Sequence, residues 1–297
     1  MAASRTPSAK ATAKTAEFDC GGEAGGAAAG PLFVLATAQF AIRATTLKLS
    51  QPDGRGASVI HPLIRNLEQH DQLSDEERRV LLGAISRDRE VGANEDIISE
   101  GDRPWESTIL VDGFAARYKV QAEGVRRISA IHVPGDFVDL HSFLLRKMDH
   151  GVLALTACRL SAVPHDNLEK ISGEHPHLTR LLWTSTVIDG AVHREWLVQI
   201  AGGQAYRRTA HLICELFVRL RAVELTDGDS FTFPLTQTDF GDMLGMTNVH
   251  MNRTLMELRS DGLATWKGGT VTIHDWDRLK QTARFDPTYL NLPSERK

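Results

Sequence analysis

A short stretch near the C-terminus carries side chains whose types suit contacts with nucleic acid. Within residues 235–258, apolar residues recur at helical spacing on both sides of Gly245, which predicts two short helices joined by a turn. Thr236 and Thr247 stand where hydroxyl side chains cap helices. The spacing leaves five side chains of the second helix facing outward: Asn248, Val249, His250, Asn252 and Arg253. Most of these side chains can hydrogen-bond base edges or phosphates.

The segments on either side of the two helices narrow the interpretation, because two helices around a glycine are also common in proteins that never touch DNA. Residues 230–233 alternate like a short strand. Residues 263–267 and 270–274 flank Gly268-Gly269, a pattern typical of a β-hairpin. Helix, turn, helix and hairpin in this order predict a winged helix, with Lys267 in the wing as a candidate phosphate contact.

The length and composition of the chain indicate a globular protein of ordinary composition. With 297 residues, 42% hydrophobic and 24% charged, the chain has room for about two globular domains. A net charge of −4 argues against sequence-independent coating of nucleic acid, but a local basic face can still carry phosphate contacts. Basic residues near the proposed helices are Arg207, Arg208, Arg219, Arg221, Arg253 and Arg259.

The cysteines and apolar runs indicate a reducing compartment. Cys20, Cys158 and Cys214 are far apart and form no Cys-x-x-Cys pair, which argues against a disulfide scaffold, an iron–sulfur cluster or a structural zinc site. We expect Cys158 to be a core thiol, whereas Cys214 either packs or serves as a redox handle. No run has the roughly 18 apolar residues of a membrane span, and no signal peptide is evident, so we expect a cytoplasmic protein without membrane partners.

The texture of the chain predicts an α+β fold. Residues 1–55 are rich in small residues at their start and are expected to be a disordered or poorly ordered extension. Residues 56–172 should form a β-rich domain, since short β-type runs alternate with turns between residues 89 and 164, which indicates a β-barrel or sandwich. A long helix with a hinge should span 173–203, a winged helix 204–285 and a tail 286–297.

The long helix carries an apolar stripe that allows two interpretations. The stripe consists of Leu178, Leu181, Ile188, Val192, Trp196 and Ile200. Such a stripe either joins the core of the chain or forms the interface of a dimer. We favour the dimer interface, and expect Gly202-Gly203 to end the helix.

The order of parts over residues 60–285 resembles the Crp/Fnr family of bacterial transcription regulators. The resemblance rests on Glu100-Gly101-Asp102 and Pro134-Gly135-Asp136-Phe137 in the β-rich domain, and above all on residues 235–263, which end in Arg259-Ser260-Asp261-Gly262-Leu263. It implies that residues 56–172 form an antiparallel, jelly-roll-like β-roll that acts as a sensor domain. It also implies a homodimer that binds a palindromic site near a promoter on double-stranded DNA and works with RNA polymerase.

The resemblance also assigns roles to residues of the second helix. Arg253 matches the family's arginine and is the best candidate for guanine, while Asn248 and Asn252 suit adenine or a phosphate. Val249 stands where many members carry a glutamate that accepts a hydrogen bond from cytosine, so the preferred half-site should differ from the commonest one of the family.

The β-roll departs from members that bind cyclic nucleotides. Gly135-Asp136 stands where those members carry Gly-Glu, and the run around Arg146 and Lys147 lacks their phosphate-binding Arg-Ser pair. We therefore expect no dependence on cyclic nucleotides and an unknown effector, for which the pocket candidates are Gly135, Asp136, Phe137, Arg146 and Lys147.

No cofactor, metal site or enzymatic activity is expected. His132, His141 and His150 are isolated in the sequence, and isolated histidines are seldom ligands. Phosphate-binding, nucleophile-elbow and zinc-protease motifs are absent from the sequence. The alternative to a DNA-binding regulator is a ligand-sensing β-roll module whose winged helix contacts another protein.

Overall fold

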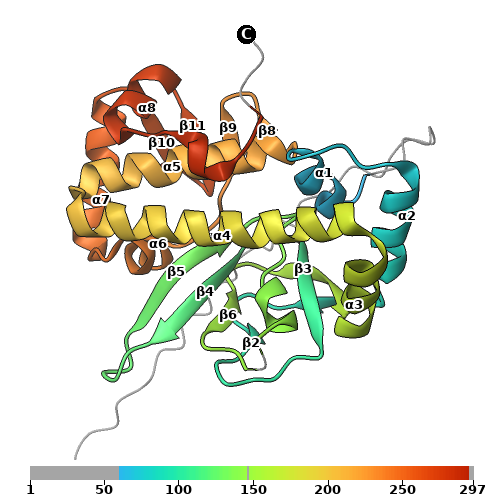
Figure 1. Cartoon of the computed structure of the whole chain (residues 1–297). Coiled ribbons are helices and arrows are strands. Elements are labelled where there is room, and N and C mark those ends of the chain that lie inside the picture. Colours follow the sequence, from blue (N-terminus) through green and yellow to red (C-terminus); the bar gives the residue numbers. More distant parts are fainter. Residues whose placement is uncertain (1–59, 146, 294–297) are drawn as a thin grey trace, which may run out of the picture. The chain divides into compact units, whose positions relative to one another are not determined.

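The order of elements agrees with the predicted α+β fold (Figure 1). The computed structural model describes residues 60–145 and 147–293, so the predicted extension 1–55, Cys20 and Arg146 lie outside the described residues. Two helices, α1 (Pro62–Glu68) and α2 (Asp75–Ala84), precede the strands. Ser74 and Glu77 form a capping box at the start of α2, because each side chain receives a hydrogen bond from the other's backbone N–H.

The predicted β-roll consists of antiparallel strands that pack around an apolar core. In one sheet the strand order is β1 (Arg87–Val91), β7 (Cys158–Pro164), β3 (Glu106–Asp112). In the other it is β2 (Asp96–Ile98), β6 (Gly151–Ala154), β4 (Ala115–Val120), β5 (Arg126–His132). A short 3₁₀ turn, η1 (Leu140–Phe143), lies between β5 and β6. The Cys158 thiol is buried in this core, as expected.

Helix α3 (His165–Glu174) leads into the long helix α4 (Pro176–Gly202), and the interpretation of its apolar stripe as a dimer interface was wrong. Leu178, Leu181, Val192 and Trp196 are buried within the chain itself. They pack against α3, the β-roll and α5 (Ala205–Ala222), so the stripe belongs to the core. Of the predicted stripe, only Ile200 is exposed.

The opposite side of α4 carries a second set of apolar residues that the sequence analysis overlooked. Trp183, Val187, Leu197 and Val198 are 58–68% exposed, and their spacing along the helix places them on one side of it. We call these four residues the outer face of α4. Apolar side chains on opposite sides of one helix cannot both be buried by a single neighbouring domain. Of the described helices, none is long and apolar enough to cross a membrane.

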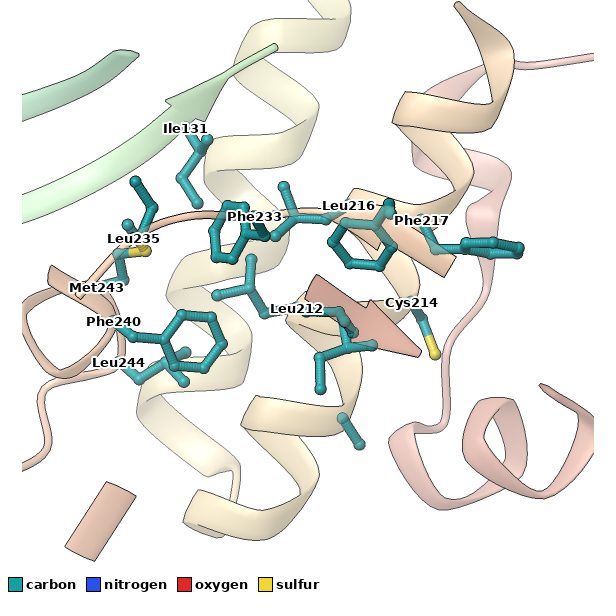
Figure 2. Packing of buried hydrophobic residues seen from close by; sticks show 14 of the residues in the cluster. Ile131, Leu212, Cys214, Leu216, Phe217, Phe233, Leu235, Phe240, Met243 and Leu244 are labelled. Atoms are coloured by element: carbon teal, nitrogen blue, oxygen red, sulfur yellow. The ribbon is translucent and has the colours of Figure 1, made fainter. Parts of the chain in front are cut away.

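The part of the chain that follows α5 forms the predicted winged helix. Its sheet has the order β10 (Ala264–Lys267), β11 (Thr270–Ile273), β9 (Ser230–Thr232), β8 (Thr226–Asp227), and its helices are α6 (Gln237–Leu244), α7 (Asn248–Ser260) and α8 (Trp276–Ala283), followed by the 3₁₀ turn η2 (Pro287–Leu290). Figure 2 shows the core of this region, where the ring of Phe233 lies near Phe240 of α6, with 6.0 Å between the ring centroids. Phe231 lies between Phe233 and Phe217 of α5 and contacts both rings. The Cys214 thiol is buried in the same core and burial raises its pKa, which argues against a redox handle.

Candidate nucleic-acid interface and adjoining cavity

Local hydrogen bonds fix the two helices of the predicted motif. The Thr236 hydroxyl accepts from the Asp239 N–H (3.1 Å) and donates to the Asp239 carboxylate (2.6 Å), which caps α6. Gly245 ends α6 with a positive φ of 63°, as the turn required. The Thr247 hydroxyl then accepts from the His250 N–H (3.3 Å) and caps α7. The two capping threonines are therefore committed to orienting the helices.

The turn between the helices also depends on Gly241, whose role the sequence analysis missed. A Cβ at this position would lie 2.6 Å from the backbone oxygen of Met246, so no side chain fits there. The Asn248 amide donates to the Thr238 hydroxyl (3.2 Å) and ties the start of α7 to α6. The position of Gly241 within a predicted helix could have indicated this role, because glycine is unfavourable within a helix and is often found where another segment approaches closely.

One side of α7 is left open to solvent. Met251, Thr254 and Leu258 are buried against the rest of the winged helix. The opposite side consists of Val249, Asn252, Arg253 and Met256, which we call the outward face of α7. Val249 and Met256 are 81% and 70% exposed, which is unusual for large apolar side chains on a solvated helix. Met256 was not predicted, although its spacing of seven residues from Val249 places it on the same face.

The polar side chains of α7 that we predict to contact nucleic acid are accessible to solvent. Asn248 and Asn252 are exposed at the start and middle of the helix, and His250 is half-buried. Arg253 has a 70% exposed side chain and a long 3.8 Å ion pair with Glu257, a type of surface pair that holds a side chain only weakly. The side chain of Arg253 can therefore turn toward a ligand at little cost.

The predicted wing is a tight hairpin. Lys267 pairs with Thr270 across the turn, and Gly268 and Gly269 have φ values of 61° and 79°, which suit a type I′ turn. The Lys267 side chain is exposed at the end of β10, a strand that contacts α7.

Arg219, one of the basic residues near the motif in the sequence, does not belong to this surface. Its guanidinium is largely buried and donates to the Asp136 carboxylate (2.7 Å) and the backbone oxygen of Ile131 (2.9 Å). It also contacts the fully buried carboxylate of Glu215 (3.2 Å). Arg219 thus joins α5 to the β-roll and is excluded as a phosphate contact.

A cavity of about 90 Å³ lies where the β-roll, α4 and α5 meet. Gly135, Asp136 and Phe137 line it, as predicted for an effector pocket. The Asp136 carboxylate, however, already accepts hydrogen bonds from Arg219, the Asn66 amide (3.0 Å) and the Val133 N–H (2.9 Å). Lys147 is exposed beside Gly101 and does not line this cavity, so the predicted pocket residues are only partly brought together.

Paired charges dominate the walls of the cavity. Arg117 on β4 donates to Asp189 on α4 (2.9 Å), and the Arg117 side chain is only 8% exposed. Burial alone would raise the pKa of Asp189, but Arg117 and His132 lower it below its ordinary value. Burial also lowers the pKa of His132 well below its ordinary value, so this imidazole is neutral. The charged groups of these walls are therefore paired with one another, whereas Arg117 Nε, His132 Nε2 and His141 Nε2 are buried without a hydrogen-bond partner.

Comparisons with known proteins agree with both halves of this description. Residues 88–175 match the family model described as a cyclic nucleotide-binding domain, and residues 207–282 match the one described as a Crp-like helix-turn-helix domain. The chain is 25% identical to the transcriptional activator protein FnrL of Cereibacter sphaeroides, over 71% of this chain and 86% of that protein. It is 24% identical to the regulatory protein HlyX of Actinobacillus pleuropneumoniae, over 70% of this chain and 86% of that protein.

A solved structure shares the fold. The structure of FixK2 from Bradyrhizobium japonicum aligns with a TM-score of 0.60 and 24% sequence identity, covering 66% of this chain and 96% of FixK2. The likeness therefore shows that the two proteins share a fold over two thirds of this chain.

Proposed function

This chain belongs to the Crp/Fnr family of transcriptional regulators, and we propose that it binds a palindromic DNA site as a homodimer through the outward face of α7. The observation that carries the proposal is the composition of that face. It combines Asn252 and Arg253, which can hydrogen-bond base edges, with two exposed apolar side chains that suit thymine methyl groups.

The start of α7 provides a second kind of contact. The first N–H groups of a helix attract anions, and Asn248 and His250 lie in this first turn. Together with Lys267 in the wing, they are our candidates for phosphate contacts. Thr236 and Thr247 act in this proposal by orienting α6 and α7, because their hydroxyls are committed to the helix caps.

The outer face of α4 is the proposed dimer interface. Trp183, Val187, Leu197 and Val198 place four exposed apolar side chains on one side of a helix of 27 residues. A second copy of the same face would bury them in a symmetric contact. Two copies of α7 would then enter successive major grooves, about 34–36 Å apart.

The cavity argues against a cyclic nucleotide as the effector. Its volume of about 90 Å³ is small beside the roughly 300–1,000 Å³ typical of pockets for drug-sized ligands. Asp189 and Asp136 also hold Arg117 and Arg219 in ion pairs, so neither guanidinium is free to bind a phosphate. We therefore propose control that does not depend on cyclic nucleotides, action in the cytoplasm, and a contact with RNA polymerase from a site near a promoter.

Selection of bound duplexes from a random DNA pool tests the proposed function. We expect an inverted repeat whose half-sites are about one helical turn apart, with thymine at the position that faces Val249. Recovery of no preferred sequence at moderate salt would contradict the proposal, and would favour a winged helix that contacts another protein.

The dimer interface has its own test. Trp183→Glu places a charge on the outer face of α4 and removes its largest apolar side chain, so we expect monomers in sedimentation velocity and loss of cooperative binding to the two half-sites. Leu144→Glu in the β-roll is a matched control, because Leu144 has the same 68% exposure as Trp183. Dimers of unchanged stability in the Trp183→Glu variant would show that another surface joins the copies.

A further inference from the structure

Three potential metal ligands from separate turns of the β-roll meet beside the cavity. His141 lies in η1, whereas Asp149 and His150 come directly before β6. One ligand atom from each residue lies within 4.8 Å of those of the other two. The two imidazole rings are 5.0 Å apart between centroids. The sequence analysis treated these histidines as isolated, because the chain brings them together only when the strands pair.

The hydrogen bonds leave both imidazoles with an unused nitrogen. His150 Nδ1 is 2.7 Å from the Asp149 carboxylate, a contact that is satisfied when Nδ1 carries the proton. His150 Nε2 then holds a lone pair, is buried and has no partner. His141 Nε2 is also buried without a partner. A buried polar nitrogen left without a partner is unfavourable, so two of them side by side point to a bound ligand.

The two free nitrogens of the site are shielded from solvent. The His150 side chain is only 8% exposed, and His141 Nε2 and His150 Nε2 are both buried. A bound ion would therefore displace no hydrogen bond within the chain at either nitrogen, and an imidazole nitrogen without a proton is a common metal ligand.

We propose that His141, Asp149 and His150 bind one divalent first-row transition metal ion, with zinc as the best match. Two imidazole nitrogens and one carboxylate oxygen are a donor set that such ions accept, and the fourth position of a tetrahedral site would remain for water or a small ligand. The three donor atoms lie up to 4.8 Å from one another, so a small side-chain movement is needed to bring them around one ion. Asp149 can make this movement most easily, because its side chain is 73% exposed.

The charges around the site are compatible with a cation. Arg117 is the nearest buried positive charge and opposes metal binding, but its ion pair with Asp189 neutralises it. The positive charge of Lys119 also attracts the Asp149 carboxylate, but Lys119 is exposed and solvent screens this attraction strongly. His132 is neutral and adds no charge. With the Asp149 carboxylate, the site therefore offers a net negative environment to a divalent ion.

Metal titration of the untagged full-length protein tests this site. The protein is stripped with a chelator, titrated with Co²⁺ while visible absorption is recorded, and then titrated with Zn²⁺ in competition. We expect one equivalent to bind, with cobalt bands of a nitrogen and oxygen site and without an intense thiolate charge-transfer band. His141→Ala should weaken zinc affinity by roughly 10–100-fold, the range typical for losing a ligand or its support.

Asp149→Asn keeps the test decisive if His141→Ala fails to fold, because the Asp149 side chain is exposed and the substitution preserves its size. It should also weaken zinc affinity by roughly 10-fold or more. His274→Ala in the wing is the matched control and should leave affinity unchanged, since His274 is exposed on another element. Absence of saturable binding, equal affinity in all variants, or a thiolate band would overturn the proposal. None of these outcomes bears on DNA binding, which is measured separately.

Discussion

The outward face of α7 and the cavity beneath α4 hold their polar side chains in opposite states. On α7, Arg253 and Asn252 are exposed, and Arg253 forms only a long 3.8 Å ion pair with Glu257 among the residues that the structure describes. In the cavity, the side chains of Asp136 and Arg219 are only 18% and 13% exposed and contact each other at 2.7 Å. The first pair of side chains is available to an external partner, while the second is already used within the chain.

This difference separates recognition from architecture. Replacing an exposed side chain of α7 should change DNA affinity and leave folding intact, because the lost contacts are with DNA alone. Replacing a paired side chain of the cavity should lower the free energy of unfolding, because a buried charge is left without its partner. The predictions below follow this division from the largest expected effect to the smallest.

Asp136→Ala should cause the largest loss of stability. It leaves the buried Arg219 guanidinium without its 2.7 Å partner and removes the acceptor for Asn66. Breaking one partner of a buried ion pair costs about 3–5 kcal/mol, and Glu215, which also contacts Arg219, should hold the loss near the lower end. Urea denaturation measures it. The exposed Asp227→Ala is the control and should change the free energy of unfolding by less than about 0.5 kcal/mol.

Asp139→Asn should change how stability depends on pH. Burial raises the pKa of Asp139 to about 7, although the Thr108 N–H donates to its carboxylate. Because the folded pKa lies above the unfolded one, this group contributes stability below about pH 4 that is lost as the pH rises toward 7. The loss amounts to about 2–4 kcal/mol at 1.36 kcal/mol per pKa unit.

The asparagine variant should lack this decline, since its amide oxygen can accept from Thr108 without ionising. Free energies of unfolding measured for both proteins between pH 4 and 8 should therefore diverge as the pH rises, with the variant becoming relatively more stable. Parallel curves would show that Asp139 titrates at its ordinary value. Comparing the two proteins cancels the opposite contribution of buried histidines such as His132, which lose stability in acid.

Glu257→Gln should have the smallest effect. Its carboxylate is 51% exposed and 3.8 Å from Arg253, so the pair contributes at most about 1 kcal/mol to stability. Removing the charge should free Arg253 and reduce repulsion of phosphates, raising DNA affinity slightly, by less than about 1 kcal/mol. Fluorescence anisotropy at two salt concentrations measures this gain, and a loss of affinity would mean that Glu257 itself contacts the DNA.

Local features of the winged helix were predictable because a few neighbouring residues determine them. The hydroxyls of Thr236 and Thr247 cap helices by accepting a hydrogen bond from the N–H three residues later in the chain. Gly245 and Gly268 adopt positive φ angles, which other residues rarely adopt. The predicted α+β fold was confirmed for the same reason, since each element is indicated by its own sequence.

Contacts between distant segments were not predictable. Arg219 and Arg253 look alike in sequence, yet Arg219 is buried because Asp136, 83 residues away, faces it from the β-roll. The apolar stripe of α4 was assigned to a dimer because its burial by α5 and the β-roll depends on how these elements pack. His141 and His150 were dismissed singly, and only the strand pairing brings their rings together.

The most direct test of the account compares the wild type with Arg253→Ala on the selected palindrome and on a shuffled duplex. We predict that the variant loses about 1–3 kcal/mol of affinity for the palindrome, binds the shuffled duplex almost as before, and unfolds at the same urea concentration. Arg79→Ala, an exposed arginine on α2, should match the wild type. Unchanged affinity of the Arg253 variant for the palindrome would contradict the assignment of the outward face of α7 as the surface that recognises DNA sequence.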